Sequence, residues 1–201
     1  MKNYYNINGF YSPLKLFSID QAKLYRTNLE KVESKIGQLH YFAKTYTMMR
    51  WVYDIATNKT LLNFVEDIIG KNILLYNATF IIKEAKSKTH VSWHQDLTYW
   101  GFSNNEKQVS AWIALSDTND HSGCMKMIPG SHKKGIFEHQ STNDSNNVLS
   151  RGQTVTNVDI DKSISCPLHP GEASFHHGLT LHASQPNKSD DRRIGLNLQF
   201  I

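Results

Sequence analysis

The stretch Gln108-Val109-Ser110-Ala111-Trp112-Ile113-Ala114-Leu115 decides the fold class of this 201-residue chain. Apolar residues alternate with a second set, and this period of two is typical of a β-strand with one face against a core. The core-facing set is Val109, Ala111, Ile113 and Leu115. The opposite set is Gln108, Ser110, Trp112 and Ala114. Residues 193–200 alternate in the same way, so two strands carry polar or aromatic side chains on one face.

The first third of the chain has a helical period instead. Ser18 and Gln21 form a capping-box pattern, and apolar residues then recur every three or four positions up to Gly37. We therefore expect a helix over 19–36. Two further helical stretches are expected, one at about 46–56 and one that ends at Gly70.

Helices followed by short strands predict antiparallel sheets with the helices packed on one outer face. The polar strand faces must then meet each other across a second sheet. A polar interior is costly unless it is a binding site, so the pattern predicts a site between the sheets. We expect one domain over 1–201, with a helical flank at 1–70, a core at 71–201 and a long polar surface loop at 138–153.

Composition limits the class of protein and its setting. Hydrophobic residues make up 39% of the chain and charged residues 20%, which is typical of a globular protein. The net charge of +4 is small and scattered, so we expect no nucleic-acid partner. No apolar run is long enough for a membrane span, and the first ten residues lack the apolar stretch of a secretory signal. The two cysteines exclude a disulfide scaffold. We therefore expect a cytoplasmic protein, whose oligomeric state the sequence does not fix.

Trp93-His94-Gln95-Asp96 is the strongest local chemical signal. On a strand, residues two apart point the same way, so His94 and Asp96 present an imidazole and a carboxylate to one point. These are two of the three ligands of the two-His-one-carboxylate triad that binds Fe(II). Taken alone, such a triplet is also compatible with a surface pair that binds no metal.

A second signal is His182, which is followed eleven residues later by Arg193. Strand alternation places Arg193 on the polar side with Asn197 and Gln199, whereas Arg192 falls on the apolar side. Arg193 is therefore the expected inward cation, and its bidentate fork suits a carboxylate. The alternative for this segment is a pair of arginines at a solvated strand end.

Several further motifs occur in one order along nearly the whole chain. They are residues 5–13, Gly70-Lys71-Asn72-Ile73, residues 91–100, residues 111–115, Ser122-Gly123-Cys124-Met125, residues 128–133, Pro170-Gly171-Glu172, His182-Ala183-Ser184, and Asn187-Lys188-Ser189 with Arg192-Arg193. With these motifs the chain resembles the phytanoyl-CoA dioxygenase family of Fe(II)/2-oxoglutarate oxygenases. The resemblance implies a double-stranded β-helix (a cupin-like jelly roll) with N-terminal helices packed on one sheet.

The resemblance also implies roles for single residues. It implies that His94, Asp96 and His182 bind the iron and that Arg193 pairs with the distal carboxylate of 2-oxoglutarate. Trp112, Ser184 and Thr79 match further co-substrate positions of the family. A co-substrate lysine that the family carries upstream of the 73–83 strand has no clear counterpart. His176 and His177 are weaker alternatives to His182, and the histidines expected on surfaces or loops are His40, His90, His121, His139 and His169.

The reaction that the resemblance implies uses Fe(II), 2-oxoglutarate and O2. It yields succinate and CO2 and hydroxylates an unactivated C–H bond of a small molecule. Related halogenases carry a small residue where this chain has Asp96, so hydroxylation is expected rather than halogenation. The alternative is a non-catalytic or truncated jelly-roll binding protein, since many relatives continue past the position of Ile201. The substrate is not predicted, and the candidate pocket or lid elements are Gln95, Tyr99, Trp100, Phe102 and the 138–153 loop.

Overall fold

The computed structural model describes residues 1–100, 107–149 and 152–201, and the side chain of Trp100 is not described. Its α-helices are α1 (Lys2–Asn8), α2 (Ile19–Ile36), α3 (Arg50–Ala56), α4 (Lys59–Ile69) and α5 (Leu97–Trp100). Short 3-10 helices are η1 (Thr45–Thr47), η2 (Ser131–Lys134) and η3 (Ile160–Lys162). The strands are β1 (Phe10–Lys15), β2 (Leu75–Lys83), β3 (Val91–His94), β4 (Val109–Ala114), β5 (Met125–Met127), β6 (Gln140–Ser141), β7 (Gln153–Thr154), β8 (Ile164–Cys166), β9 (Glu172–His176), β10 (His182–Ser184) and β11 (Arg193–Phe200).

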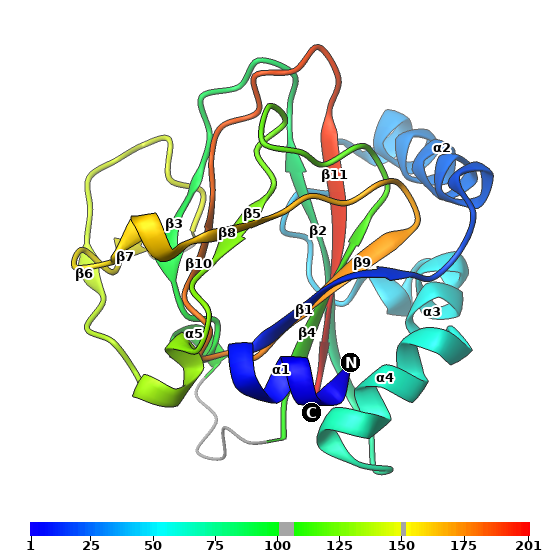
Figure 1. Cartoon of the computed structure of the whole chain (residues 1–201). Helices are drawn as coiled ribbons and strands as arrows, with labels where there is room; N and C mark the ends of the chain where they lie inside the picture. Colours follow the sequence, from blue (N-terminus) through cyan, green and yellow to red (C-terminus); the bar gives the residue numbers. More distant parts are fainter. Residues whose placement is uncertain (101–106, 150–151) are drawn as a thin grey trace.

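A five-stranded antiparallel sheet forms the centre of the molecule, in the order β1-β9-β4-β11-β2. Helices α2, α3 and α4 cover its outer face (Figure 1). The main hydrophobic core lies between these helices and the sheet, and it includes Val109, Ala111, Ile113 and Leu115 of the predicted alternation. The predicted strand at 108–115 and its two faces are therefore confirmed.

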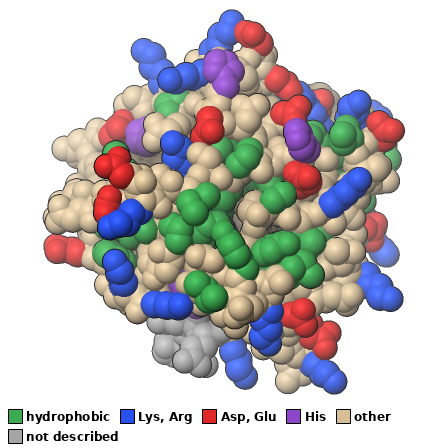
Figure 2. Space-filling view, in the orientation of Figure 1, with side chains coloured by type: hydrophobic (Ala, Val, Ile, Leu, Met, Phe, Trp, Pro, Cys, Tyr) green, Lys and Arg blue, Asp and Glu red, His purple; other side chains and the backbone are tan. Residues whose placement is uncertain are grey.

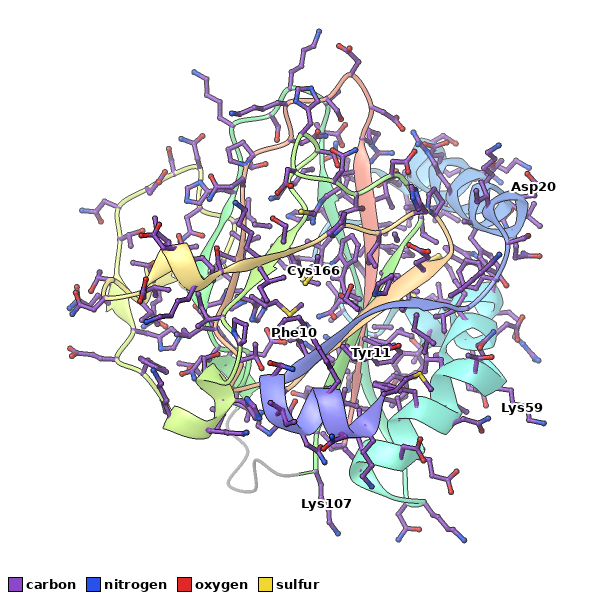
Figure 3. All side chains as sticks on the ribbon, in the orientation of Figure 1. Phe10, Tyr11, Asp20, Lys59, Lys107 and Cys166 are labelled. Atoms are coloured by element: carbon purple, nitrogen blue, oxygen red, sulfur yellow. The ribbon has the colours of Figure 1, made fainter. Side chains whose placement is uncertain are left out.

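The inner face of this sheet packs against a four-stranded sheet in the order β3-β10-β5-β8. A second cluster of buried residues joins the two sheets: Phe10, Trp112, Ala114, Met125, Met127, Cys166 and Leu168. Phe10 and Cys166 of this cluster are labelled in Figure 3. Two facing sheets with helices on one outer side give the predicted double-stranded β-helix.

The predicted helices are found, with one correction. The side chain of Ser18 accepts from the backbone N–H of Gln21, and α2 ends before Gly37 as predicted. The stretch at 46–56 is not one helix, because Met49 has an extended backbone and its side chain turns into the core. The segment is therefore divided into η1 and α3.

The region expected as a purely helical flank, 1–70, also contains the edge strand β1, which was not predicted. Strand β1 pairs with β9, and the register shifts between Tyr11 and Leu14. Pro13 lies in this interval, and proline lacks the N–H that an inner strand would need. At the sheet edge that N–H is not required, so a proline-containing segment can serve as a strand.

Part of the segment predicted as a loop at 138–153 lies against the smaller sheet. The backbones of His90 and Val148 hydrogen-bond, and the side chain of Asn147 accepts from the N–H of Ser92. Residues 146–148 therefore lie beside the start of β3, while β6 pairs with β7. Figure 2 shows charges of both signs interspersed over one face, with hydrophobic side chains gathered at its centre. None of the described helices is both long and apolar enough to cross a membrane.

Candidate active site

His94, Asp96 and His182 converge between the two sheets. His94 ends β3, His182 begins β10, and the two residues are register partners in the smaller sheet. Asp96 follows β3 by two residues, so it points to the same side as His94. The Nε2 atoms of His94 and His182 lie 3.5 and 3.7 Å from Oδ1 of Asp96. One nitrogen or oxygen from each residue lies within 4.8 Å of the others.

Backbone carbonyls fix both imidazoles in the state that a metal needs. Nδ1 of His94 lies 2.9 Å from the carbonyl oxygen of Ser92, and Nδ1 of His182 lies 2.9 Å from that of Thr180. A carbonyl only accepts, so each Nδ1 carries a hydrogen, and in the neutral imidazole the lone pair is then on Nε2. Burial, together with the neighbouring His94 and His176, lowers the pKa of His182. His182 therefore stays neutral, which is the form that binds a metal.

The second oxygen of Asp96 is held from the large sheet. The hydroxyl of Ser110 donates to Oδ2 over 2.8 Å, and Nε2 of His176 lies 3.2 Å from the same atom. Burial raises the pKa of Asp96, but the neighbouring His176, His94 and His182 outweigh it and hold that pKa well below its usual range. The carboxylate is therefore ionised, with Oδ1 turned toward the two histidines.

His176 contributes to the site without being one of the predicted ligands. It is the register partner of Ser110 across β9 and β4, which explains why both residues reach the same oxygen. His177 points elsewhere, because its Nδ1 accepts from the N–H of Leu179. The alternation of β9 alone could have identified His176 as inward, but its partner Asp96 lies on the opposite sheet.

The three residues lie in a pocket of about 370 Å³. Its lining also contains all four residues matched to the co-substrate: Thr79, Trp112, Ser184 and Arg193. The inward set predicted from strand alternation, Arg193 with Asn197 and Gln199, lines the same pocket. The sequence therefore predicted which face of β11 borders the site.

Arg193 is a buried cation whose charge has no protein partner. Its side chain is 1% exposed, and no guanidinium nitrogen hydrogen-bonds any residue that the structure describes. The guanidinium carbon lies 5.0 Å from the ring centre of Trp112. Burial lowers the pKa of Arg193 to about 10, so the group remains charged near neutral pH. A buried, unpaired guanidinium requires an anion, which the pocket can admit.

Arg192 faces the opposite way and is paired. Its guanidinium donates to Glu33 of α2 over 2.8 and 3.2 Å, and its Nε donates to Glu84 over 3.1 Å. Arg192 thus links α2 to the outer side of the sheet, and it does not line the pocket.

Gln95 and His139 form hydrogen bonds that we did not predict from the sequence. The amide of Gln95 donates to the carbonyls of Gly135 and Leu179 and accepts from the N–H of Phe137. Nε2 of His139 accepts from the N–H of Gln95. The side chain of Gln95 therefore links segments near Gly135 and Leu179 through hydrogen bonds. It does not line the pocket, because it points to the side opposite His94 and Asp96.

Other candidates have mixed outcomes. Tyr99 lines the pocket, and so does Leu149 from the 138–153 loop. Phe102 and the side chain of Trp100 lie outside the described part of the chain. His40 was expected on the surface or in a loop; it lies between α2 and η1, and its Nδ1 accepts from the N–H of Ile82 in β2. Lys83 was not singled out at all, although it is buried directly behind Ser184.

Comparison with protein families gives a match to the model described as phytanoyl-CoA dioxygenase, over residues 6–195. The chain belongs to the phytanoyl-CoA dioxygenase family. A probable alpha-ketoglutarate-dependent hypophosphite dioxygenase of Stutzerimonas stutzeri is 28% identical over 69% of this chain and 49% of the relative. Peroxisomal phytanoyl-CoA dioxygenase of Homo sapiens is 24% identical over 94% of this chain and 56% of the relative. The chain thus spans about half the length of these curated relatives.

A solved structure has the same fold. The apo form of ThoJ, a non-heme monooxygenase, superimposes with a TM-score of 0.86 and 25% identity, over all of this chain and 76% of that one. Two imidazole nitrogens and one carboxylate oxygen, with room on the pocket side, match the ligand set of non-heme Fe(II) oxygenases. The donor chemistry and the unpaired Arg193 therefore fit the family's cofactors, Fe(II) and 2-oxoglutarate.

Proposed function

We propose that this chain is an Fe(II)- and 2-oxoglutarate-dependent dioxygenase that hydroxylates an unactivated C–H bond of a small molecule, with succinate and CO2 as co-products. The observation that carries the proposal is the buried guanidinium of Arg193, unpaired within the described chain, in the same pocket as the convergent His94, Asp96 and His182. A carboxylate bound by Arg193 would satisfy its charge, while the other end of a short keto diacid would face the metal ligands.

The protein's own groups have separate tasks in this reaction. His94, Asp96 and His182 would hold the metal, and bound Fe(II) would supply dioxygen activation and the oxidative decarboxylation of 2-oxoglutarate. Arg193 would bind the distal carboxylate, with the ring of Trp112 fixing the guanidinium plane. Ser110 and His176 hold Asp96 in place. The carboxylate at position 96 supports hydroxylation, because it fills the position that a halide would need.

The remaining part of the pocket is rich in uncharged hydrogen-bonding groups. Tyr76, Asn77, Asn197 and Gln199 line it, and Arg193 is the only lysine or arginine among its described lining residues. Oδ1 of Asn197 is buried and has no hydrogen-bond partner among the described residues. This lining supports a small substrate that is neutral near the reacting carbon and that carries a hydroxyl or amide hydrogen-bond donor. A coenzyme A ester would require cations for its phosphates.

The test is succinate formation from 2-oxoglutarate in air with Fe(II), first alone and then with a panel of small neutral and anionic molecules. The proposal predicts slow turnover alone and a marked increase with one neutral member, which should also gain one oxygen atom by mass spectrometry. Arg193→Ala and Asp96→Ala serve as inactive controls. Binding of 2-oxoglutarate without any succinate across the panel would support the non-catalytic jelly-roll alternative instead.

A further inference from the structure

Lys83 places a second basic group beside Arg193. It is the last residue of β2 and the register partner of Arg193 on β11, and both side chains are 1% exposed. Neither side chain forms a salt bridge with any residue in the described parts of the chain. Lys83 is not part of the pocket lining and lies behind Ser184, which is. Two neighbouring buried cations are costly unless an anion lies close to both.

Three oxygens surround the Lys83 Nζ atom. They are the carbonyl oxygen of Ser184 at 3.1 Å, the hydroxyl oxygen of Ser184 at 2.7 Å, and the carbonyl oxygen of Gln185. In its protonated form Lys83 has three hydrogens and no lone pair, so it then donates to all three oxygens. The Ser184 hydroxyl then acts as an acceptor toward Lys83, and its own hydrogen is free to point into the pocket.

We propose that Lys83 is a positioning residue for 2-oxoglutarate, which turns the Ser184 hydroxyl hydrogen toward the carboxylate held by Arg193 and adds a second positive charge behind it. This inference rests on the proposed function, because it assigns a neighbour to the same co-substrate. Lys83 acts through Ser184 and through its charge, without touching the co-substrate itself.

The charge of Lys83 depends on what occupies the pocket. Burial, together with the neighbouring Arg193, lowers the pKa of Lys83 to about 6. The other titratable groups that interact with it are Cys124, which raises this pKa, and His40, whose own pKa falls to about 4 through burial and the charges of Arg193 and Lys83. Glu84 faces outward and pairs with Arg192. A bound dicarboxylate therefore favours protonation of Lys83, and its binding near pH 7.5 should take up a proton.

The neutral form of Lys83 would reverse the role of Ser184. A neutral amine has two hydrogens and one lone pair, so it can donate to both carbonyls and accept from the Ser184 hydroxyl. The hydroxyl hydrogen would then point away from the pocket. Protonation of Lys83 and presentation of the Ser184 hydrogen to the co-substrate are thus the same event.

Calorimetry of 2-oxoglutarate binding tests the inference on the full chain, loaded with Mn(II) and kept free of oxygen. Lys83→Met should weaken 2-oxoglutarate binding about 10- to 100-fold, the range for losing a charge-assisted hydrogen bond, while Mn(II) affinity stays unchanged. Lys86→Met is the matched control, because Lys86 is an exposed lysine just after the end of β2 and pairs with Asp190. Adding Ser184→Ala to Lys83→Met should cost less than the two single effects combined, because the two residues act together.

Proton uptake on binding separates positioning of the co-substrate from support of the fold. Binding enthalpies in buffers of different ionisation enthalpy should show proton uptake near pH 7.5 for the wild type and for Lys86→Met, and none for Lys83→Met. Equal 2-oxoglutarate affinity for Lys83→Met and the wild type, or no proton uptake by the wild type, overturns the inference and leaves the proposed function intact. A wild type that binds Mn(II) but no 2-oxoglutarate overturns both.

Discussion

Arg192 and Arg193 are adjacent in the chain and have opposite surroundings. Arg193→Ala removes the bidentate partner proposed for the distal carboxylate, so it should weaken 2-oxoglutarate binding by about 2–5 kcal/mol, roughly 30- to several-thousand-fold. Lysine at this position should give an intermediate effect, because it keeps the charge and loses the fork. Steady-state kinetics with varied 2-oxoglutarate measure the change as a rise in KM.

Arg192→Ala is the matched control for that prediction. It should leave the KM for 2-oxoglutarate nearly unchanged and lower the free energy of unfolding by about 1–2 kcal/mol, because the bonds to Glu33 and Glu84 are lost. If Arg192→Ala proves to be the variant with impaired 2-oxoglutarate use, the strand register assigned to β11 is wrong.

Asp96 is a second residue whose side chain the proposed metal site requires. Asp96→Ala should abolish Fe(II)-dependent succinate formation, because it removes a metal ligand from a site with only three. The fold should persist, since the change removes no core volume, although the donors of Ser110 and His176 lose their acceptor. Metal content after dialysis and circular dichroism measure the two effects. Retention of wild-type succinate production would contradict the three-ligand assignment.

The contact between β11 and β4 depends on the absence of a side chain. Gly195 faces Trp112, and a Cβ at position 195 would lie 1.8 Å from the ring atom Cζ2. Gly195→Ala must therefore displace the indole, which should cost about 1–3 kcal/mol of stability and weaken 2-oxoglutarate binding through Arg193. Urea unfolding measures the first effect. The double variant Gly195→Ala, Trp112→Phe should recover part of the stability, and a fully stable Gly195→Ala would show that this contact is not tight.

Strand alternation predicted much of the site at the scale of elements. It gave the two faces of β4, the inward position of Arg193, and the shared direction of His94 and Asp96. It could not give the contact of His176 with Asp96, the position of Lys83 behind Ser184, or the hydrogen-bond partners of Gln95. Each of these depends on which strand lies opposite, as in the register of Lys83 with Arg193 or of His176 with Ser110. Cross-strand register depends on segments that are far apart in the chain, so it cannot be predicted from the local pattern of one sequence.

Strand β1 and the break at Met49 show the same limit for elements. Both depend on what the segment meets in three dimensions, namely the open edge of β9 and the core behind α3. The helices α2 and α4 were predictable because their caps and stops, Ser18, Gly37 and Gly70, are local signals.

The stability of the whole molecule without ligand should carry the signature of a buried lysine. The pKa of Lys83 falls to about 6 in the folded state from its ordinary value of 10.5, so the unfolded chain binds more protons between these values. Stability contributed by this group therefore rises with pH across that window, by at most about 1.4 kcal/mol per pH unit. Urea unfolding at pH 7, 8 and 9 measures the free energy of unfolding of the wild type and of Lys83→Met. The stability of the wild type relative to Lys83→Met should increase as pH rises. Parallel pH curves would indicate that Lys83 stays charged in the free protein.

We propose that one pocket holds iron on His94, Asp96 and His182 and 2-oxoglutarate on Arg193. A crystal structure of the chain with Mn(II), as an unreactive substitute for Fe(II), and with 2-oxoglutarate tests both parts of this proposal at once. We expect a metal about 2.0–2.2 Å from Nε2 of both histidines and from Oδ1 of Asp96, with the distal carboxylate bidentate on Arg193. A metal bound at other residues, or a carboxylate that leaves Arg193 unpaired, would contradict it.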